Sequence, residues 1–462
     1  PTEAEILDIL NKTKAEEITA YVDKVSDEPL MKEAPKAGKI VKTEEGPFGS
    51  TALTLSNGVR VVLKTTDFKA DEIRMRAFSP GGTSVFGTKE ALQLKMLNSV
   101  AGLGGLGNFS NVDLEKVLAG KKATIGATVS GLSEGLNGSC SPKDLETLLQ
   151  LTYLSFTAPR MDEEAFESFK QRTKASLANQ EANPMTALTD TLQMEMYGDH
   201  PLAGRVKAEM IDQLDYNRIM EMYKDRFKEA GDFTFLFVGN INLEEAKPLI
   251  ETYLGGLPTI NRKENYQDIQ LNIRKGTHKN LFEKQMETPK ATVLNIISGN
   301  CEYNLKNDLL MTMLSQTMSM VYLETVREKE GASYGVSAFG QLSRGIKDEA
   351  LFQIYFDTDP AKREKMEQIV MSELQKVAQE GPRPEHLAKV KEFLLKKHIE
   401  DAKENSYWLG QLNNYYWYKT DMNTDYEKLV NDLTAEDVKN FTKALLDQGN
   451  IIEITMTAKE AK

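Results

Sequence analysis

The stretch Leu305–Gln341, LKNDLLMTMLSQTMSMVYLETVREKEGASYGVSAFGQ, contains the strongest pattern in the sequence. Apolar residues recur at helical spacing through its first two thirds, at Leu309, Met313, Leu314, Val321 and Tyr322. A charged segment then reaches Gly331, and glycine can take the left-handed conformation that ends a helix. Apolar and polar residues alternate from Tyr334 to Phe339, as in a strand. The stretch therefore predicts an amphipathic helix, a glycine turn and a strand.

Two residues of this stretch have side chains suited to binding one oxygen atom. Arg327 falls on the last turn of the predicted helix and Tyr334 at the start of the strand, so we expect both to face the same side of the turn. A guanidinium and a phenol together suit a peptide carbonyl, or the oxyanion formed from it. A solvated arginine at a helix end beside a core tyrosine fits the same pattern. The residues alone leave both roles open.

The segment Arg327–Tyr334, entered from a long helix, resembles the RxxxxxxY segment in the C-terminal half of the pitrilysin (insulinase) family of zinc peptidases. The resemblance extends from about Ser50 to Thr457. It includes LSNGVRVVLK at residues 55–64, where Asn57-Gly58 is a hairpin-type signal, and this segment resembles the opening strand pair of each domain in that family. The resemblance implies that Arg327 and Tyr334 bind the substrate carbonyl and stabilise the oxyanion.

The chain reads as a duplicated α+β unit. The strands Phe233–Val238 and Ile451–Met456 follow similar helix signals about 219 positions apart. We predict two tandem homologous domains, pitrilysin-like or mitochondrial-processing-peptidase-like, each with a mainly antiparallel sheet covered by helices. The expected boundaries are a helical connector at 1–48, a first domain at 49–258, a linker at 259–276 and a second domain at 277–462.

Composition excludes several classes of protein. At 462 residues the chain is too long for one ordinary core, so we expect more than one domain. The net charge of −12 argues against a nucleic-acid partner, and no run of apolar residues is long enough to predict a membrane span. Cys140 and Cys301 leave the redox compartment open. Because the chain begins with proline, we expect a piece of something longer.

The segment Gly102–Gly107, GLGGLG, fits the dinucleotide-binding pattern GxGxxG letter for letter. That site needs a strand before the motif and a helix that opens on its last glycine. Here a helix is predicted before it, and the next helix has its own start signal at Ser110. We therefore predict a loop between two helices.

The family's zinc motif is missing. A catalyst of this type needs HxxEH on a helix and a distant glutamate as third ligand. The corresponding positions are occupied by Glu90–Leu94, with the sequence EALQL, and by Ser176. We expect no metal and no cofactor on this chain, with zinc on the N-terminal half. His386 and His398, twelve positions apart on one predicted helix, are expected to be surface residues, with an adventitious metal as the alternative.

The aromatic residues near one predicted helix, at Tyr407-Trp408 and Tyr415–Tyr418, are typical of packing between parts of a fold. Contact with an extended peptide is the alternative interpretation.

Two functional hypotheses follow. In the first, the chain is the non-zinc half of a clamshell zinc metalloendopeptidase, inactive alone, which supplies Arg327 and Tyr334. Its partners are the N-terminal zinc-binding half of the same polypeptide, or a homologous subunit, and a peptide substrate. In the second, it is a non-catalytic subunit or scaffold resembling the α subunit of mitochondrial processing peptidase or the respiratory core proteins. Related bacterial single-chain enzymes are often exported, so a periplasmic or otherwise exported bacterial protein is expected.

Overall fold

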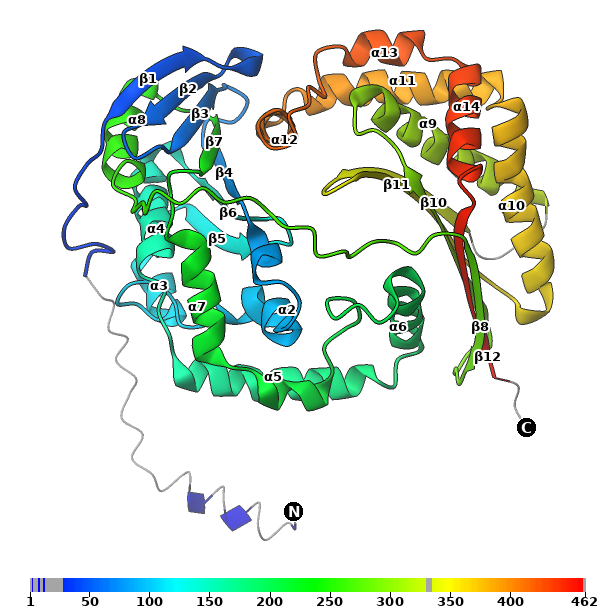
Figure 1. Cartoon of the computed structure of the whole chain (residues 1–462), viewed down its shortest axis with the longest axis horizontal. Helices are drawn as coiled ribbons and strands as arrows, with labels where there is room; N and C mark the ends of the chain where they lie inside the picture. The colour runs from blue at the N-terminus through cyan, green and yellow to red at the C-terminus, as the bar shows by residue number, and fades with distance from the viewer. Residues whose placement is uncertain (1, 3–6, 9–10, 13–27, 330–334, 460–462) are drawn as a thin grey trace.

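The computed structural model of the chain describes residues 2, 7–8, 11–12, 28–329 and 335–459. Two sheets, each covered by helices, stand on opposite sides of the molecule (Figure 1). The long helix α5 runs between them at one end, and an extended segment crosses from one side to the other. The predicted α+β class with two units is confirmed.

The first unit contains a seven-stranded sheet. Its strands are β1 (Ile40–Glu45), β2 (Thr51–Leu55), β3 (Arg60–Thr65), β4 (Ile73–Pro80), β5 (Ala123–Val129), β6 (Ser133–Cys140) and β7 (Thr234–Gly239). Its α-helices are α2 (Ala91–Val100), α3 (Asn111–Val117), α4 (Leu145–Thr157), α5 (Glu163–Gln180), α6 (Pro184–Tyr197), α7 (Tyr216–Phe227) and α8 (Leu243–Leu249). Short helical turns are η1 (Pro47–Gly49), η2 (Gly82–Phe86), η3 (Pro142–Asp144), η4 (Ala208–Gln213) and η5 (Ile250–Leu254).

The second unit contains a five-stranded sheet. Its strands are β8 (Thr277–Lys284), β9 (Ala291–Asn300), β10 (Val336–Arg344), β11 (Asp348–Thr358) and β12 (Asn450–Ala458). Its helices are α9 (Leu305–Tyr322), η6 (Leu323–Lys329), η7 (Pro360–Lys362), α10 (Arg363–Glu380), α11 (Pro384–Asp401), α12 (Asn405–Tyr416), α13 (Tyr426–Asp432) and α14 (Ala435–Leu446).

The two sheets share one topology. The first has the strand order β1-β2-β3-β7-β4-β6-β5 and the second β10-β11-β9-β12-β8. Read in the opposite direction, the second sheet repeats the last five strands of the first. Each contains one parallel pair, β3 with β7 and β8 with β12, and the other pairings are antiparallel. The predicted duplication therefore appears in the strand pairing itself.

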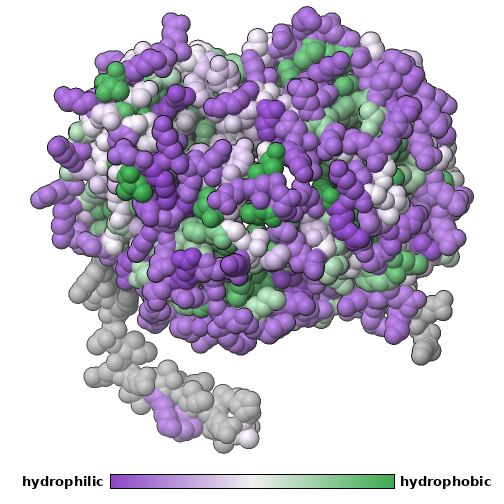
Figure 2. Space-filling view, viewed as in Figure 1, coloured by the Kyte–Doolittle hydropathy of each residue, from purple (hydrophilic) through white to green (hydrophobic). Residues whose placement is uncertain are grey.

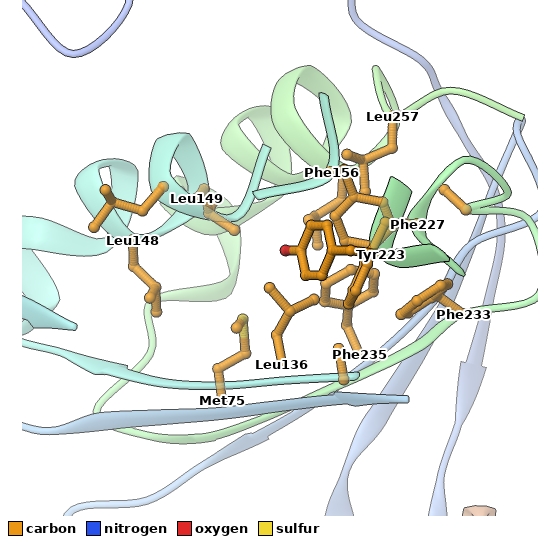
Figure 3. Packing of buried hydrophobic residues seen from close by; sticks show 14 of the residues in the cluster. Met75, Leu136, Leu148, Leu149, Phe156, Tyr223, Phe227, Phe233, Phe235 and Leu257 are labelled. Atoms are coloured by element: carbon orange, nitrogen blue, oxygen red, sulfur yellow. The ribbon is translucent and has the colours of Figure 1, made fainter. Parts of the chain in front are cut away.

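Each sheet has one face covered by helices of its own unit. In the first unit, β-strand residues such as Met75, Leu136 and Phe235 pack against α4 and α7, where Phe156 lies 5.2 Å from Phe227 between ring centroids (Figure 3). In the second unit, α9, α10 and α14 cover the corresponding face. The helical spacing read at Leu309 to Tyr322 is confirmed, because all five of its residues are buried in this core.

On its other face, each sheet is covered by a helix that comes from the other unit. The helix α12, from the second unit, lies on the first sheet, where Leu409, Leu412 and Tyr416 pack against Ala52, Val62, Leu236 and Val238. The helix α6, from the first unit, lies on the second sheet through Leu188 and Met196. The two units are thus joined by packing as well as by the chain, and the aromatic-rich helix serves mainly this purpose.

The structure contains the turn and the helix start that local sequence signals predicted. Asn57-Gly58 closes the β2–β3 hairpin, with Gly58 at a φ of +93°. The GLGGLG segment is a loop between α2 and α3, and the Ser110 side chain accepts a hydrogen bond from the backbone of Asp113 at the start of α3. No nucleotide-binding unit of strand, glycine turn and helix is formed at this point.

Two segments outside the domain cores have defined structure. The expected helical connector does not extend to residue 48, because Ile40–Glu45 form the edge strand β1, paired with β2. The predicted linker has no helix or strand and lies against the first unit, where the backbone amides of Ile260 and Arg262 donate to Glu229 at 3.0 and 2.7 Å. Within the described part of the chain, no helix has the length and apolar character needed to span a membrane.

Candidate functional site

The predicted pair lies where α9 ends. The helix continues through η6, which has wider π-helical turns and contains Arg327 in its backbone. The side chain of Arg327 and the whole of Tyr334 lie outside the residues that the structure describes. Their mutual geometry is therefore not established, and the pair stays a prediction.

The described residues around Arg327 anchor this end of the helix. Val326 is fully buried, and the Tyr322 hydroxyl donates a hydrogen bond to the carbonyl of Val370 at 3.0 Å. Leu323, on the opposite side, is exposed. Single π-helical turns within longer helices occur frequently at functional sites. The backbone before Arg327 is thus fixed on one side and open to solvent on the other.

An ionic cluster ties η6 to α11. Glu324 lies 2.9 Å from Nε2 of His386 and also contacts Arg383. The pKa of Glu324 is lowered, first by the hydrogen bond with His386 and then by that with Arg383. His386 is 1% exposed, so the expectation that it lies on the surface is wrong. Its partner Glu324 is 62 positions away, so the two residues could not be paired from their spacing in the sequence.

His398 contacts an aromatic ring and belongs to no metal-binding group within the described residues. Its ring stacks on Tyr426 at 4.1 Å between centroids, and burial lowers its pKa. The two histidines of α11 therefore contact different groups. Among the described residues, no group of three or more His, Cys, Asp or Glu side chains is arranged to hold a metal ion.

The residues that the sequence analysis places at the zinc motif have side chains engaged in other contacts. Glu90 makes a two-pronged ion pair with Arg218 of α7, at 2.8 Å for both contacts. Gln93 donates to the carbonyl of Gln213 and accepts from the amide of Asp215, each at 3.0 Å. Leu94 is buried in the core, and Ser176 is exposed on α5. These side chains attach α2 to the start of α7 in place of a metal ligand set.

A second site, which the sequence analysis missed, is a buried ionic network at the base of the linker. Arg226 of α7 is 1% exposed and contacts Glu264 at 2.7 Å, Asp225, and Glu134 at 3.9 Å. It borders a cavity of about 920 Å³ that α7 and the linker share. Burial raises the pKa of Glu134 to about 7. The signal was present in the sequence, because Arg226 falls at helical spacing among buried apolar residues of α7.

This network has the character of an anchor. Two of its carboxylates, Asp225 and Glu264, contact arginines from both α7 and the linker, since Arg262 lies 3.1 Å from Asp225 and 3.4 Å from Glu264. Removing one partner of a buried ion pair leaves an uncompensated charge, so the two segments that these pairs join are held together. We therefore assign the network to holding the linker, and no reacting group to it.

Comparison with known proteins identifies relatives of this fold. Residues 213–394 match the family model described as the peptidase M16 inactive domain. A zinc protease PQQL-like protein of Arabidopsis thaliana is 26% identical over 425 residues, which cover 87% of this chain and 41% of that protein. The chain spans less than half the length of the curated relatives that it matches.

Two solved structures share the whole architecture. The periplasmic protease PqqL of Escherichia coli has a TM-score of 0.83 and 19% identity over 99% of this chain and 51% of its own. A peptidase M16 inactive domain from Pseudomonas fluorescens has a TM-score of 0.73 and 16% identity over 89% of this chain and 98% of its own. At these identities the likeness demonstrates a common fold.

The resemblance predicted from the sequence is thereby confirmed. Residues 213–394 of the chain match the inactive domain of the peptidase M16 family, and most of the chain is similar in sequence to a zinc protease PQQL-like protein and in fold to PqqL.

Proposed function

We propose that this chain is the substrate-binding, non-zinc half of a zinc metalloendopeptidase that acts on peptides or unfolded proteins. One observation carries the proposal: residues 213–394, which include Arg327 and Tyr334, match the inactive domain of a peptidase family. The relatives named as zinc proteases are more than twice as long as the part that matches. The partner is the zinc-binding half of the same polypeptide or a homologous subunit.

In this proposal Arg327 and Tyr334 donate hydrogen bonds to the carbonyl of the bound peptide and to the oxyanion that it becomes. Donors of this kind accelerate a reaction when they bind the transition state more tightly than the ground state. The buried anchor at Val326 and the hydrogen bond of Tyr322 support the role, because they fix the helix from which Arg327 extends. A fixed donor loses little orientational freedom on binding.

In this proposal the chain supplies no ligand to the catalytic zinc. The ion pair of Glu90 with Arg218 and the backbone contacts of Gln93 occupy the side chains at the position of the metal motif. The chain alone is therefore expected to hydrolyse no peptide and to bind no stoichiometric zinc. We also propose an exported location, periplasmic in a bacterium, which the periplasmic protease among its structural neighbours supports.

The test uses the chain joined to its zinc-binding half. Arg327→Ala and Tyr334→Phe are each expected to lower kcat by roughly a hundredfold, the usual loss for one oxyanion donor. The melting temperature should stay within the range of the controls. Arg172→Ala, at an exposed arginine of α5, and Tyr415→Phe, at an exposed tyrosine of α12, are the matched controls.

Unchanged turnover in both variants would assign the pair a structural role. Absence of any peptidase activity in the joined protein would favour the alternative, a scaffold resembling the processing-peptidase α subunit or the respiratory core proteins.

A further inference from the structure

A small cavity lies on the face of the first sheet that α12 partly covers. Its volume is about 230 Å³, and it is bounded by β4, β5 and β6 on one side and by the end of α12 on the other. Alternation along β4 decides which residues reach it. Met75 and Ala77 point into the core, whereas Arg76 and Phe78 point to the opposite face and line the cavity.

Arg76 is unusual among the arginines of this chain. It is half-buried, and its one hydrogen bond to the described part of the chain runs from Nε to the side-chain oxygen of Asn137 at 3.1 Å. No carboxylate within the described residues forms an ion pair with it. The other half-buried or buried arginines whose side chains are described each contact a carboxylate, namely Arg74, Arg160, Arg205, Arg218, Arg226, Arg262, Arg344 and Arg363.

An unpaired guanidinium in a partly desolvated position does not stabilise the fold. Burial lowers the pKa of Arg76, because desolvation outweighs the favourable interaction with Tyr418. A charge of this kind is expected to be compensated by a partner. Among the residues that the structure describes, none accepts a hydrogen bond from the terminal nitrogens of Arg76, so the fork that binds carboxylates in two-pronged fashion is available.

The surrounding side chains complete a binding site. Asn413 and Tyr418 line the cavity, and their side-chain polar atoms make no hydrogen bond within the described part of the chain. Trp417 packs edge-on against Phe78 at 5.3 Å between ring centroids and forms an apolar wall. Glu134 also borders the cavity, but its carboxylate is engaged by the amide of Gly82 at 2.7 Å on the core side.

We propose that the cavity at Arg76 is a subsite for a carboxylate group of a bound peptide, either an acidic side chain or the C-terminal carboxylate. Its volume suits one such group with its methylenes, and one guanidinium matches one carboxylate. The polypeptide nature of the ligand depends on the function proposed above. The site lies on the face of the first sheet away from its own helical layer. Hydrophilic side chains dominate the face of the whole molecule that Figure 2 shows.

Calorimetry with the 462-residue chain tests the subsite without any hydrolysis. Four short peptides of one sequence distinguish the source of the carboxylate: a glutamate or a glutamine at one position, each with a free or an amidated C-terminus. Binding by the glutamate peptide with an amidated end assigns the site to an acidic side chain. Binding by the glutamine peptide with a free end assigns it to the C-terminus.

Arg76→Gln is expected to lower the affinity for the carboxylate-bearing peptide at least tenfold and to leave the melting temperature of the chain unchanged. The matched control is Arg74→Gln, on the same face of the same strand, where Glu72 already contacts the arginine at 3.1 Å. That control should bind the peptide normally. Equal affinity for all four peptides, or an equal loss in both variants, would overturn the proposal.

The outcome is separable from that of the proposed function. In the protein joined to its zinc-binding half, Arg76→Gln should raise KM for the carboxylate-bearing peptide and leave kcat unchanged, whereas Arg327→Ala should lower kcat. Normal turnover in Arg327→Ala with impaired binding in Arg76→Gln would refute the oxyanion role and retain the subsite.

Discussion

Glu134 is a buried carboxyl group whose ionisation falls near neutral pH. It is 2% exposed, accepts the amide of Gly82, and lies near Arg226 and Asp232. Burial raises its pKa from the ordinary 4.5 to about 7. The folded protein therefore keeps a proton that the unfolded chain releases above about pH 4.5. The associated stability is fully present below that pH and is lost as the pH rises through about 7.

Glu134→Gln should remove this part of the pH dependence, because glutamine resembles the protonated acid. Between pH 5 and pH 8 the free energy of unfolding of the unmodified chain should fall by on the order of 2 to 3 kcal/mol more than that of the variant. Urea unfolding at the two pH values measures the difference. Glu392→Gln, at an exposed position of α11, is the control. Identical pH profiles for Glu134→Gln and the unmodified chain would contradict the assignment.

Residue-level prediction from the sequence succeeded where the signal was local. The hairpin at Asn57-Gly58 and the cap at Ser110 depend on neighbours within a few positions, and the structure confirms both. His386 was misjudged because its partner comes from another helix. Arg76 was not singled out, because the lack of a carboxylate partner among the described residues is visible only in the folded structure and in no sequence pattern. The pair Arg327 and Tyr334 remains a prediction.

Individual helices and strands could be predicted from the sequence, but the strands that pair and the sheet that each helix covers could not. Strand periodicity identified strands such as β7 and β12, but the order β10-β11-β9-β12-β8 depends on contacts between distant segments. The same holds for the exchange of α6 and α12, since an apolar helix face does not specify which sheet it covers. The strand β1 was missed in the expected connector because its residues, IVKTEE, are mostly polar, as suits an exposed edge.

The exchange predicts a large effect for one core residue of α12. Leu412 is fully buried against the first sheet, so Leu412→Ala should destabilise the chain by about 2 to 5 kcal/mol. Because α12 belongs to the second unit, the loss should also loosen the contact between units. Leu281→Ala, at a leucine that is 58% exposed on β8, is the control. Denaturant unfolding and hydrogen exchange in β7 report both effects.

Comparable stability of Leu412→Ala and Leu281→Ala would mean that α12 does not contribute to the packing of the first sheet. Loss of protection in β7 without a change in β9 would place the effect in the first sheet, as the structure requires.

At the scale of the whole molecule, two copies of one fold each place a helix on the sheet of the other copy (Figure 1). At the position where the sequence comparison places the metal motif in the first copy, Glu90 and Gln93 make contacts with Arg218 and with the backbone of Asp215. The described part of the chain has no group of three or more His, Cys, Asp or Glu side chains arranged to hold a metal ion. Metal analysis of the purified chain should find no stoichiometric zinc, because the described residues offer no set of ligands suited to it.

The most direct test compares the hydrolysis of one quenched fluorescent peptide by the zinc-binding half alone, by this chain alone and by the two combined. The account predicts turnover from the combination that exceeds the sum of the separate rates by roughly a hundredfold, because the donors and the reaction centre meet only there. A zinc-binding half that is as fast alone as in the combination, or hydrolysis by this chain alone, would contradict it.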